Sequence, residues 1–139
     1  MGLFSKEKKT IDPNSMTPIQ VITHLFVLIQ ISDNQISYEE KLSWLSSIKT
    51  LFPDMSEERA NFFYDEATEL LNTLDTTKKD AYLEKILNVI PQIISKDLTD
   101  KLGPEISTLI KSDGIIMTSE IEIAKKINTK LSIDINVNE

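Results

Sequence analysis

The uncharged stretch NSMTPIQVITHLFVLIQIS, residues 14–32, decides the fold that we predict from the sequence. Thr17 is a good N-cap, Pro18 suits the first helical position and Gln20 completes a capping box, so a helix begins here. Apolar residues then occupy nearly every face of that helix, which is typical of the central helix of a bundle. Its longest purely apolar run, residues 25–29, has five residues, whereas a membrane span needs about 20. We therefore predict a buried central helix and no integral membrane span.

Further helical patterns follow this stretch, so we predict an all-α, compact bundle of six or seven helices. The second helix begins after the cap Ser37 and ends at Pro53, the third begins after Ser56, and the fourth begins near Thr77. Helical spacing selects the side chains that should face the core: Leu42, Leu45, Ile48 and Phe52 in the second helix; Phe63, Ala67, Leu70 and Leu74 in the third; Leu83, Ile86, Ile90 and Ile94 in the fourth; Leu98, Leu102, Ile106, Leu109 and Ile110 in the fifth; Ala124, Ile127 and Leu131 in the sixth.

Helix-breaking residues interrupt the second half of the chain. Pro91 should kink the fourth helix or end it early, and Gly103 with Pro104 predicts a kink or a late start in the fifth. The helical domain should span residues 16–131. Residues 1–15 have no apolar period and should form a flexible N-terminal arm. In residues 132–139 apolar and polar side chains alternate, which predicts an extended C-terminal tail lying on the helices or frayed.

Composition excludes several classes of site and partner. The chain has 139 residues, which suits one domain, and it has no cysteine, which excludes disulfides, thiolate metal sites and a cysteine nucleophile. Its formal charge of −7 opposes binding to nucleic acid or anionic lipid. There is no signal-peptide pattern, so we expect a cytoplasmic protein. Phosphate-binding loops, nucleophile elbows and dinucleotide fingerprints are also missing, so we predict no enzyme activity. An enzyme of unrecognised type stays open as an alternative, after the two functions described below.

The sequence contains an internal repeat with a period of eighty residues. SDNQI at residues 32–36, followed by Glu40, matches SDGII at residues 112–116, followed by Glu120. In each copy the end of one helix leads into a turn residue that readily adopts positive φ, then an isoleucine, then a carboxylate in the first turn of the next helix. We therefore predict that one helical hairpin is used twice.

These motifs resemble the TerB-like domains of tellurite-resistance proteins, which are related to the N-terminal region of DjlA-type, membrane-bound DnaJ-family co-chaperones. The resemblance rests on residues 113–116 with Glu120, on the weaker copy at residues 33–37 with Glu40, and on the helical pattern between them. It covers roughly residues 17–131. It implies a duplicated helical bundle that acts as a protein-interaction module in a stress or tellurite response, without catalytic machinery and without a resident cofactor.

The two acidic turns also permit an alternative function. If the turns approach each other, Asp33, Glu40, Asp113 and Glu120 could hold one hard divalent cation through oxygen ligands. The other interpretation is that each carboxylate serves its own turn or helix terminus. An EF-hand is excluded because apolar and cationic side chains occupy its first ligand positions.

Three consecutive aromatic residues mark the predicted partner-binding patch. Phe62, Phe63 and Tyr64 are spread over about 200° of a helix, so at least one of them should reach the surface. The acidic residues around them, Glu57, Glu58, Asp65, Glu66 and Glu69, form a solvated face or guide a basic partner.

Two other aromatic side chains have structural interpretations. We expect His24, the single histidine, to lie at the boundary of the core with one satisfied nitrogen, and Trp44 to anchor the core.

Overall fold

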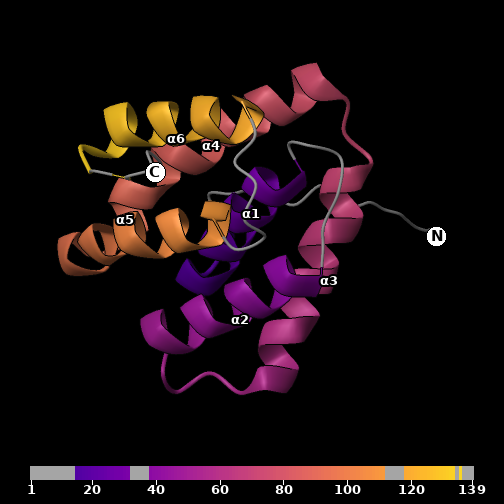
Figure 1. The fold of residues 1–139 in the computed structure, drawn as a ribbon, viewed down its shortest axis with the longest axis vertical. Helices are drawn as coiled ribbons and strands as arrows, with labels where there is room; N and C mark the ends of the chain where they lie inside the picture. The colour runs from indigo at the N-terminus through magenta and orange to yellow at the C-terminus, as the bar shows by residue number, and fades with distance from the viewer. Residues whose placement is uncertain (1–14, 32–37, 112–117, 134, 136–139) are drawn as a thin grey trace.

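The computed structural model describes residues 15–31, 38–111, 118–133 and 135, and these residues form six helices and no strand. The helices are α1 (Pro18–Gln30), α2 (Tyr38–Leu51), α3 (Glu57–Asn72), α4 (Thr76–Ile93), α5 (Lys96–Lys111) and α6 (Thr118–Leu131) (Figure 1). The all-α prediction is confirmed. No helix within the described ranges has the length and apolar character needed to cross a membrane.

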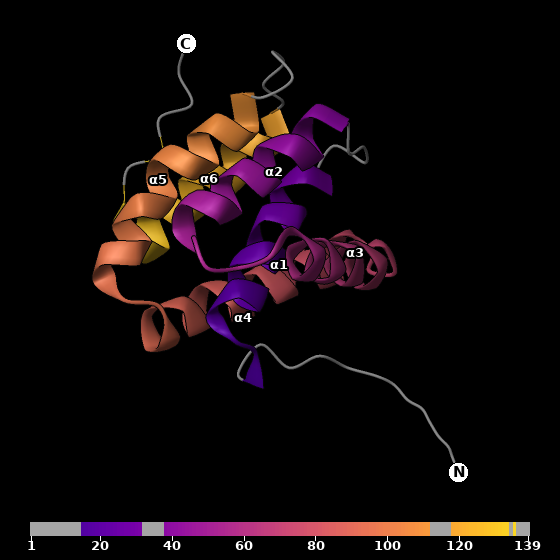
Figure 2. The same cartoon turned by 90° about the horizontal axis from the view of Figure 1, so that it is seen from below.

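Helix α1 is the centre of the bundle, as its sequence predicts. It contacts each of the five other helices, and every one of its residues except Pro18 and Gln20 is buried. Figure 2 shows α1 passing through the middle of the molecule, with α2 and α5 on one side and α3 and α4 on the other. The predicted start is also confirmed, because the Thr17 backbone N–H donates a 3.0 Å hydrogen bond to Oε1 of Gln20.

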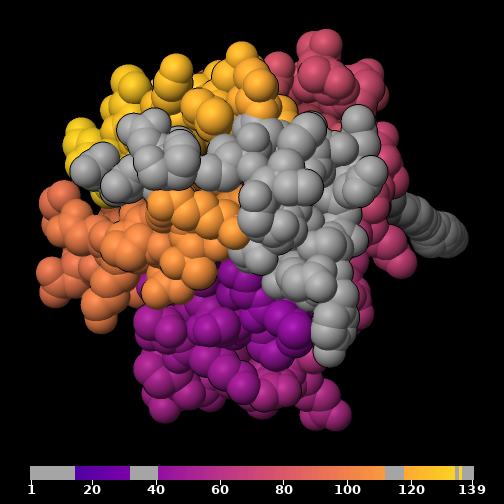
Figure 3. Space-filling view, in the orientation of Figure 1, coloured from indigo at the N-terminus to yellow at the C-terminus, as the bar shows by residue number. Residues whose placement is uncertain are grey.

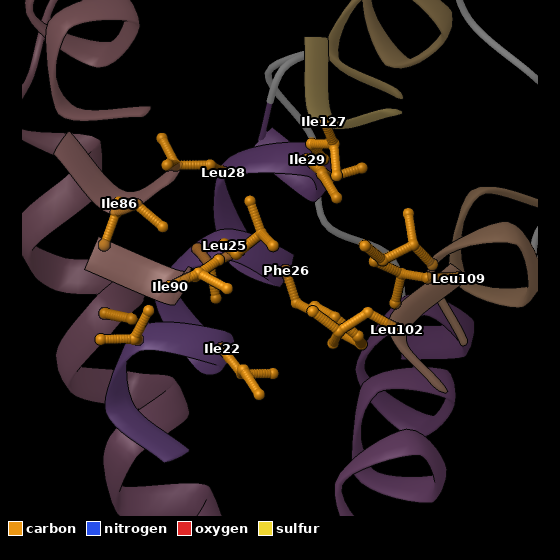
Figure 4. Packing of buried hydrophobic residues seen from close by; sticks show 14 of the residues in the cluster. Ile22, Leu25, Phe26, Leu28, Ile29, Ile86, Ile90, Leu102, Leu109 and Ile127 are labelled. Atoms are coloured by element: carbon orange, nitrogen blue, oxygen red, sulfur yellow. The ribbon is translucent and has the colours of Figure 1, made fainter. Parts of the chain in front are cut away.

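The two sides of α1 pack against different helices (Figure 4). Leu25 and Leu28 point towards Ile86 and Ile90 of α4, whereas Phe26 lies beside Leu102 of α5. A helix with apolar side chains on only one face could pack against α4 or against α5, but not against both. Because α1 is apolar on nearly every face, it can lie at the centre of the bundle.

Helices α2 and α3 form a hairpin whose arms run in roughly opposite directions but cross at an angle, since Figure 2 shows α2 along its length and α3 nearly end-on. Lys49 near the end of α2 pairs with Glu57 at the start of α3, and Lys41 near the start of α2 lies 3.9 Å from Asp65 further along α3. The turn between the helices ends at Ser56, whose hydroxyl caps α3 by accepting a 3.2 Å hydrogen bond from the Arg59 backbone N–H.

The predicted inward faces of α2 and α3 are confirmed in part, since Ile48 and Ala67 are buried and Leu45, Phe52, Phe63 and Leu74 pack against the core. In α2 the buried side chains include Trp44, Ser47, Ile48 and Leu51, while Leu42 is exposed, so its predicted inward position is wrong. In α3 the buried side chains are Ala60, Tyr64, Ala67 and Leu71, while the expected Phe63, Leu70 and Leu74 are only half-buried. The buried Trp44 and Tyr64 join the two helices, with 4.5 Å between the centroids of their rings.

Helices α4, α5 and α6 complete the bundle. Helices α4 and α6 run in the same direction, because Thr76 and Ser119 line one pocket at their first turns and Pro91 and Leu131 line another near their ends. Helix α4 continues through Pro91 and ends two residues later, at Ile93. The predicted inward residues of α4 and α6 are buried.

Helix α5 corrects one prediction about helix-breaking residues. It begins at Lys96 and includes both Gly103 and Pro104, so the late start is wrong. The Thr108 hydroxyl donates a 3.0 Å hydrogen bond to the Pro104 carbonyl, and Gly103 is buried.

The chain after α6 turns back onto that helix. Ser132 has φ of 55°, a left-handed conformation that ends α6. Asn128 of α6 then accepts a 2.7 Å hydrogen bond from the Ile135 backbone N–H through Oδ1, and the Ile135 side chain is buried. At Ile135, therefore, the predicted tail lies on the helices.

Candidate functional site

The structure separates the three aromatic residues that the sequence predicts as a partner patch. Tyr64 is only 3% exposed, and its hydroxyl donates a 2.6 Å hydrogen bond to Oε1 of Gln30 in α1. Phe63 is half-buried beneath the Arg59 guanidinium, which lies 5.9 Å from the centroid of its ring. Phe62 is 62% exposed and packs edge-on against Phe63, with 5.8 Å between the ring centroids. Of the three, Phe62 offers the surface on which a partner could bind.

A second exposed apolar side chain lies on the same hairpin, and the sequence interpretation missed it. Within the part of the chain that the structure describes, the exposed large hydrophobic side chains are Leu42, at 47%, and Phe62. Each precedes a buried aromatic residue by two positions, Trp44 in α2 and Tyr64 in α3. Residues two apart on a helix point about 200° away from each other. Burial of the Trp44–Tyr64 pair therefore holds Leu42 and Phe62 on the outside.

Leu42 and Phe62 lie at nearly the same level along the hairpin. The contacts of Lys41 with Asp65 and of Lys49 with Glu57 fix the antiparallel register, which places Leu42 opposite the segment around Phe62. Figure 3 shows α2, in purple, at the end of the molecule opposite α6, in yellow. Leu42 therefore belongs to the end of the bundle that α2 forms, and Phe62 lies in the first half of α3.

Carboxylates surround Phe62 on the outer side of α3. Glu58, Phe62, Asp65 and Glu69 follow one another at intervals of four, three and four residues, which places them on a single stripe of the helix. All four are exposed, and Asp65 lies near Lys41. We call Leu42 together with this stripe the hairpin face.

The negative charge of the whole protein is concentrated in this hairpin. Residues 38–72 contain eight acidic and three basic side chains, a formal charge of −5 out of −7 for the chain. No ion pair of Glu58 or Glu69 occurs among the residues that the structure describes. The hairpin face therefore combines exposed apolar area with the carboxylates of Glu58 and Glu69, which have no ion pair among the described residues, and of Asp65, which lies near Lys41.

A pocket of about 270 Å³ lies between α1, α4 and α6. Leu28, Ile31 and Leu83 are the buried part of its wall. Lys79, Asp80, Glu122 and Lys126 bring two positive and two negative charges to its rim. The rim has no net formal charge, in contrast to the hairpin face.

The predicted cation site falls mostly outside the described residues. Asp33 and Asp113 lie outside them, as does the side chain of Glu40. Glu120 is described and is 2% exposed in the first turn of α6. No group of three or more histidine, cysteine or acidic side chains that could hold a metal occurs in the ranges that the structure covers. The cation site and the duplicated turns stay predictions.

His24 is a core residue, so its predicted place at the boundary is wrong. Its ring is 1% exposed, and Nδ1 shares a 2.9 Å hydrogen bond with the Tyr82 hydroxyl of α4. Nε2 has no hydrogen-bond partner among the described residues, so the expectation of one satisfied nitrogen is confirmed. Burial disfavours the charged imidazolium and lowers the pKa of His24 from 6.5 to about 4. The ring is neutral at pH 7 and is sealed from any substrate in solution.

Trp44 anchors the core as predicted, with no exposed surface. Its indole packs on Tyr64 rather than lining a pocket that the structure describes.

Comparisons with protein-family models, with curated proteins and with solved structures found no match to this chain. The TerB-like resemblance therefore rests on the sequence motifs themselves.

Proposed function

We propose that this chain is a non-catalytic protein-interaction module and that the hairpin face binds its partner. The observation that carries the proposal is the exposure of Leu42 and Phe62 at one level of one hairpin. Exposed aromatic and aliphatic side chains within a polar surround are typical of the anchors of protein interfaces. Because the Trp44–Tyr64 contact holds both side chains outside, the face exists before a partner arrives.

We also propose that the module is TerB-like and works in a cytoplasmic stress or tellurite response. The support for this part comes from the motif at residues 113–116 with Glu120, from its weaker copy at residues 33–37 with Glu40, and from an all-helical bundle around them.

The experiment that tests the hairpin face is quantitative affinity capture from the cells that make this protein. The double variant Leu42→Ser/Phe62→Ser removes both apolar anchors, and both positions are exposed, so the fold should be retained. Lys85→Ser/Lys101→Ser is the matched control, because these exposed lysines lie on α4 and α5. We expect the wild type and the control variant to capture the same partner protein, and the Leu42→Ser/Phe62→Ser variant to capture much less of it. Equal capture by all three proteins would refute the proposal.

A second candidate function is divalent-cation binding by Asp33, Glu40, Asp113 and Glu120. The observation that favours it is the burial of the Glu120 carboxylate in the first turn of α6, directly after the segment that carries Asp113. Titration with calcium and with magnesium, followed by backbone amide shifts, tests this candidate. Saturable shifts in both acidic turns would support it, and shifts in neither turn would reject it.

A further inference from the structure

We infer that the partner presents a cationic amphipathic helix, whose apolar side chains contact Leu42 and Phe62 and whose lysine or arginine side chains face Glu58, Asp65 and Glu69. This inference rests on the proposed function of the hairpin face and adds the chemistry of the partner.

The spacing of the stripe suits a helical partner. Glu58 and Glu69 are eleven residues apart, which corresponds to about 16 Å along the helix axis, or three turns. Phe62 lies between them, so carboxylates flank an apolar anchor on both sides. A partner helix that carries an apolar residue with basic residues one turn before and one turn after it would place opposite charges along this length.

The backbone of the hairpin also favours a helix over an extended peptide. An extended peptide gains most of its affinity by adding a strand to an exposed sheet edge. The described residues form no strand, so they offer no such edge. An exposed helix face such as that of α3 instead offers ridges of side chains, against which another helix can pack.

The sign of the charge excludes three other occupants. Nucleic acid and anionic lipid are repelled by a hairpin with a formal charge of −5. A second copy of this chain is also excluded, because a symmetric contact through the same face would oppose Glu58, Asp65 and Glu69 to carboxylates of the other copy. The remaining complementary surface is a positively charged one with apolar side chains.

Three synthetic 18-residue helical peptides test the inference on the full-length protein. The first has leucine on one face and lysine on the other, the second has glutamate in place of each lysine, and the third has serine in place of each leucine. Binding is measured by titration of backbone amide shifts in the isotope-labelled protein, at 50 and 300 mM sodium chloride. We expect the leucine–lysine peptide alone to bind, with the largest shifts in α2 and α3. We also expect its affinity to fall at least fivefold at the higher salt concentration.

Variants separate the hairpin face from a general effect of net charge. Phe62→Ser should weaken the leucine–lysine peptide at least fivefold. Glu58→Lys/Glu69→Lys should abolish its binding and permit binding of the leucine–glutamate peptide. Asp80→Lys/Glu122→Lys is the control, because it makes the same change in net charge at exposed positions of α4 and α6 and should leave the affinity unchanged within twofold. An equal loss in both double variants, or shifts centred on α4 and α6, would overturn the inference.

The peptide experiment and the capture experiment can fail separately. If no peptide binds but Leu42→Ser/Phe62→Ser still loses a cellular partner, the chemistry assigned to the partner is wrong and the hairpin face stands. If the peptides bind at the hairpin face but capture is unchanged, the charge complementarity is real and the proposed function is wrong. If both experiments fail, the hairpin face is not a binding surface.

Discussion

Acidification should destabilise this protein through His24. The imidazole is buried, its pKa is lowered to about 4, and the unfolded chain should titrate near the ordinary value of 6.5. Above pH 6.5 the ring is neutral in both states and contributes no pH dependence. Between pH 6.5 and 4 the unfolded state binds a proton that the folded state does not, so the free energy of unfolding falls as the pH falls. Below pH 4 both states are protonated and the loss stops growing.

The size of this effect follows from the two pKa values. With 6.5 in the unfolded state and about 4 in the folded state, His24 should cost about 2 kcal/mol of stability at pH 5 and about 3 kcal/mol at pH 4. That is a large fraction of the stability of a domain of this size, which is typically about 5–15 kcal/mol in total.

The assay compares urea unfolding of the wild type with that of His24→Gln from pH 7 to pH 4. The glutamine amide can still pair with the Tyr82 hydroxyl, and it does not titrate in this range. The acidic side chains titrate in both proteins, so the difference between the two curves isolates His24. We expect the wild type to lose about 2 kcal/mol more than the variant between pH 7 and pH 5. Parallel curves, or an imidazole titration midpoint near 6.5 in the folded wild type, would refute the reasoning.

Three further substitutions probe the core, the hairpin face and the tail. Trp44→Ala should lower the free energy of unfolding by about 3–5 kcal/mol in urea unfolding followed by circular dichroism, since the indole is fully buried; a loss below about 1 kcal/mol would contradict its role as an anchor. Phe62→Ser should change the same quantity by less than about 0.5 kcal/mol, and a larger loss would mean that Phe62 is a core residue. Asn128→Ala should raise amide hydrogen exchange at Ile135 about tenfold, because it removes the hydrogen bond to that N–H; unchanged exchange would show that Asn128 does not hold the tail.

The central helix could be predicted because its sequence leaves few alternatives. Residues 14–32 carry no charge and are apolar at most positions, so any arrangement that exposed one face of this helix would leave apolar surface in water. The capping residues Thr17 and Gln20 then fix where the helix begins. Local sequence and tertiary packing agree here, and the prediction is confirmed.

The orientation of α2 and α3 could not be predicted in the same way. Both sequences contain two overlapping apolar stripes, and periodicity alone does not choose between them. The choice depends on the contact of Trp44 with Tyr64 and on the hydrogen bond from Tyr64 to Gln30, which join residues in three different helices. Leu42 is exposed in this orientation of α2, which is why the sequence identified Phe62 but missed Leu42.

His24 illustrates a second limit of sequence reasoning. A lone histidine in an apolar helix suggests the edge of the core, because an unpaired imidazole is costly to bury. Its partner, the Tyr82 hydroxyl, lies 58 residues away in the sequence, and only the packing of α1 against α4 brings the two groups together.

Site-specific photocrosslinking in the cells that make this protein tests the central claim most directly. A benzophenone-bearing phenylalanine analogue replaces Phe62 on the hairpin face in one strain, and it replaces the exposed Asn88 on α4 in another. We predict a discrete covalent adduct with another protein from position 62 and none from position 88. An adduct from position 88 but not from position 62 would contradict the claim.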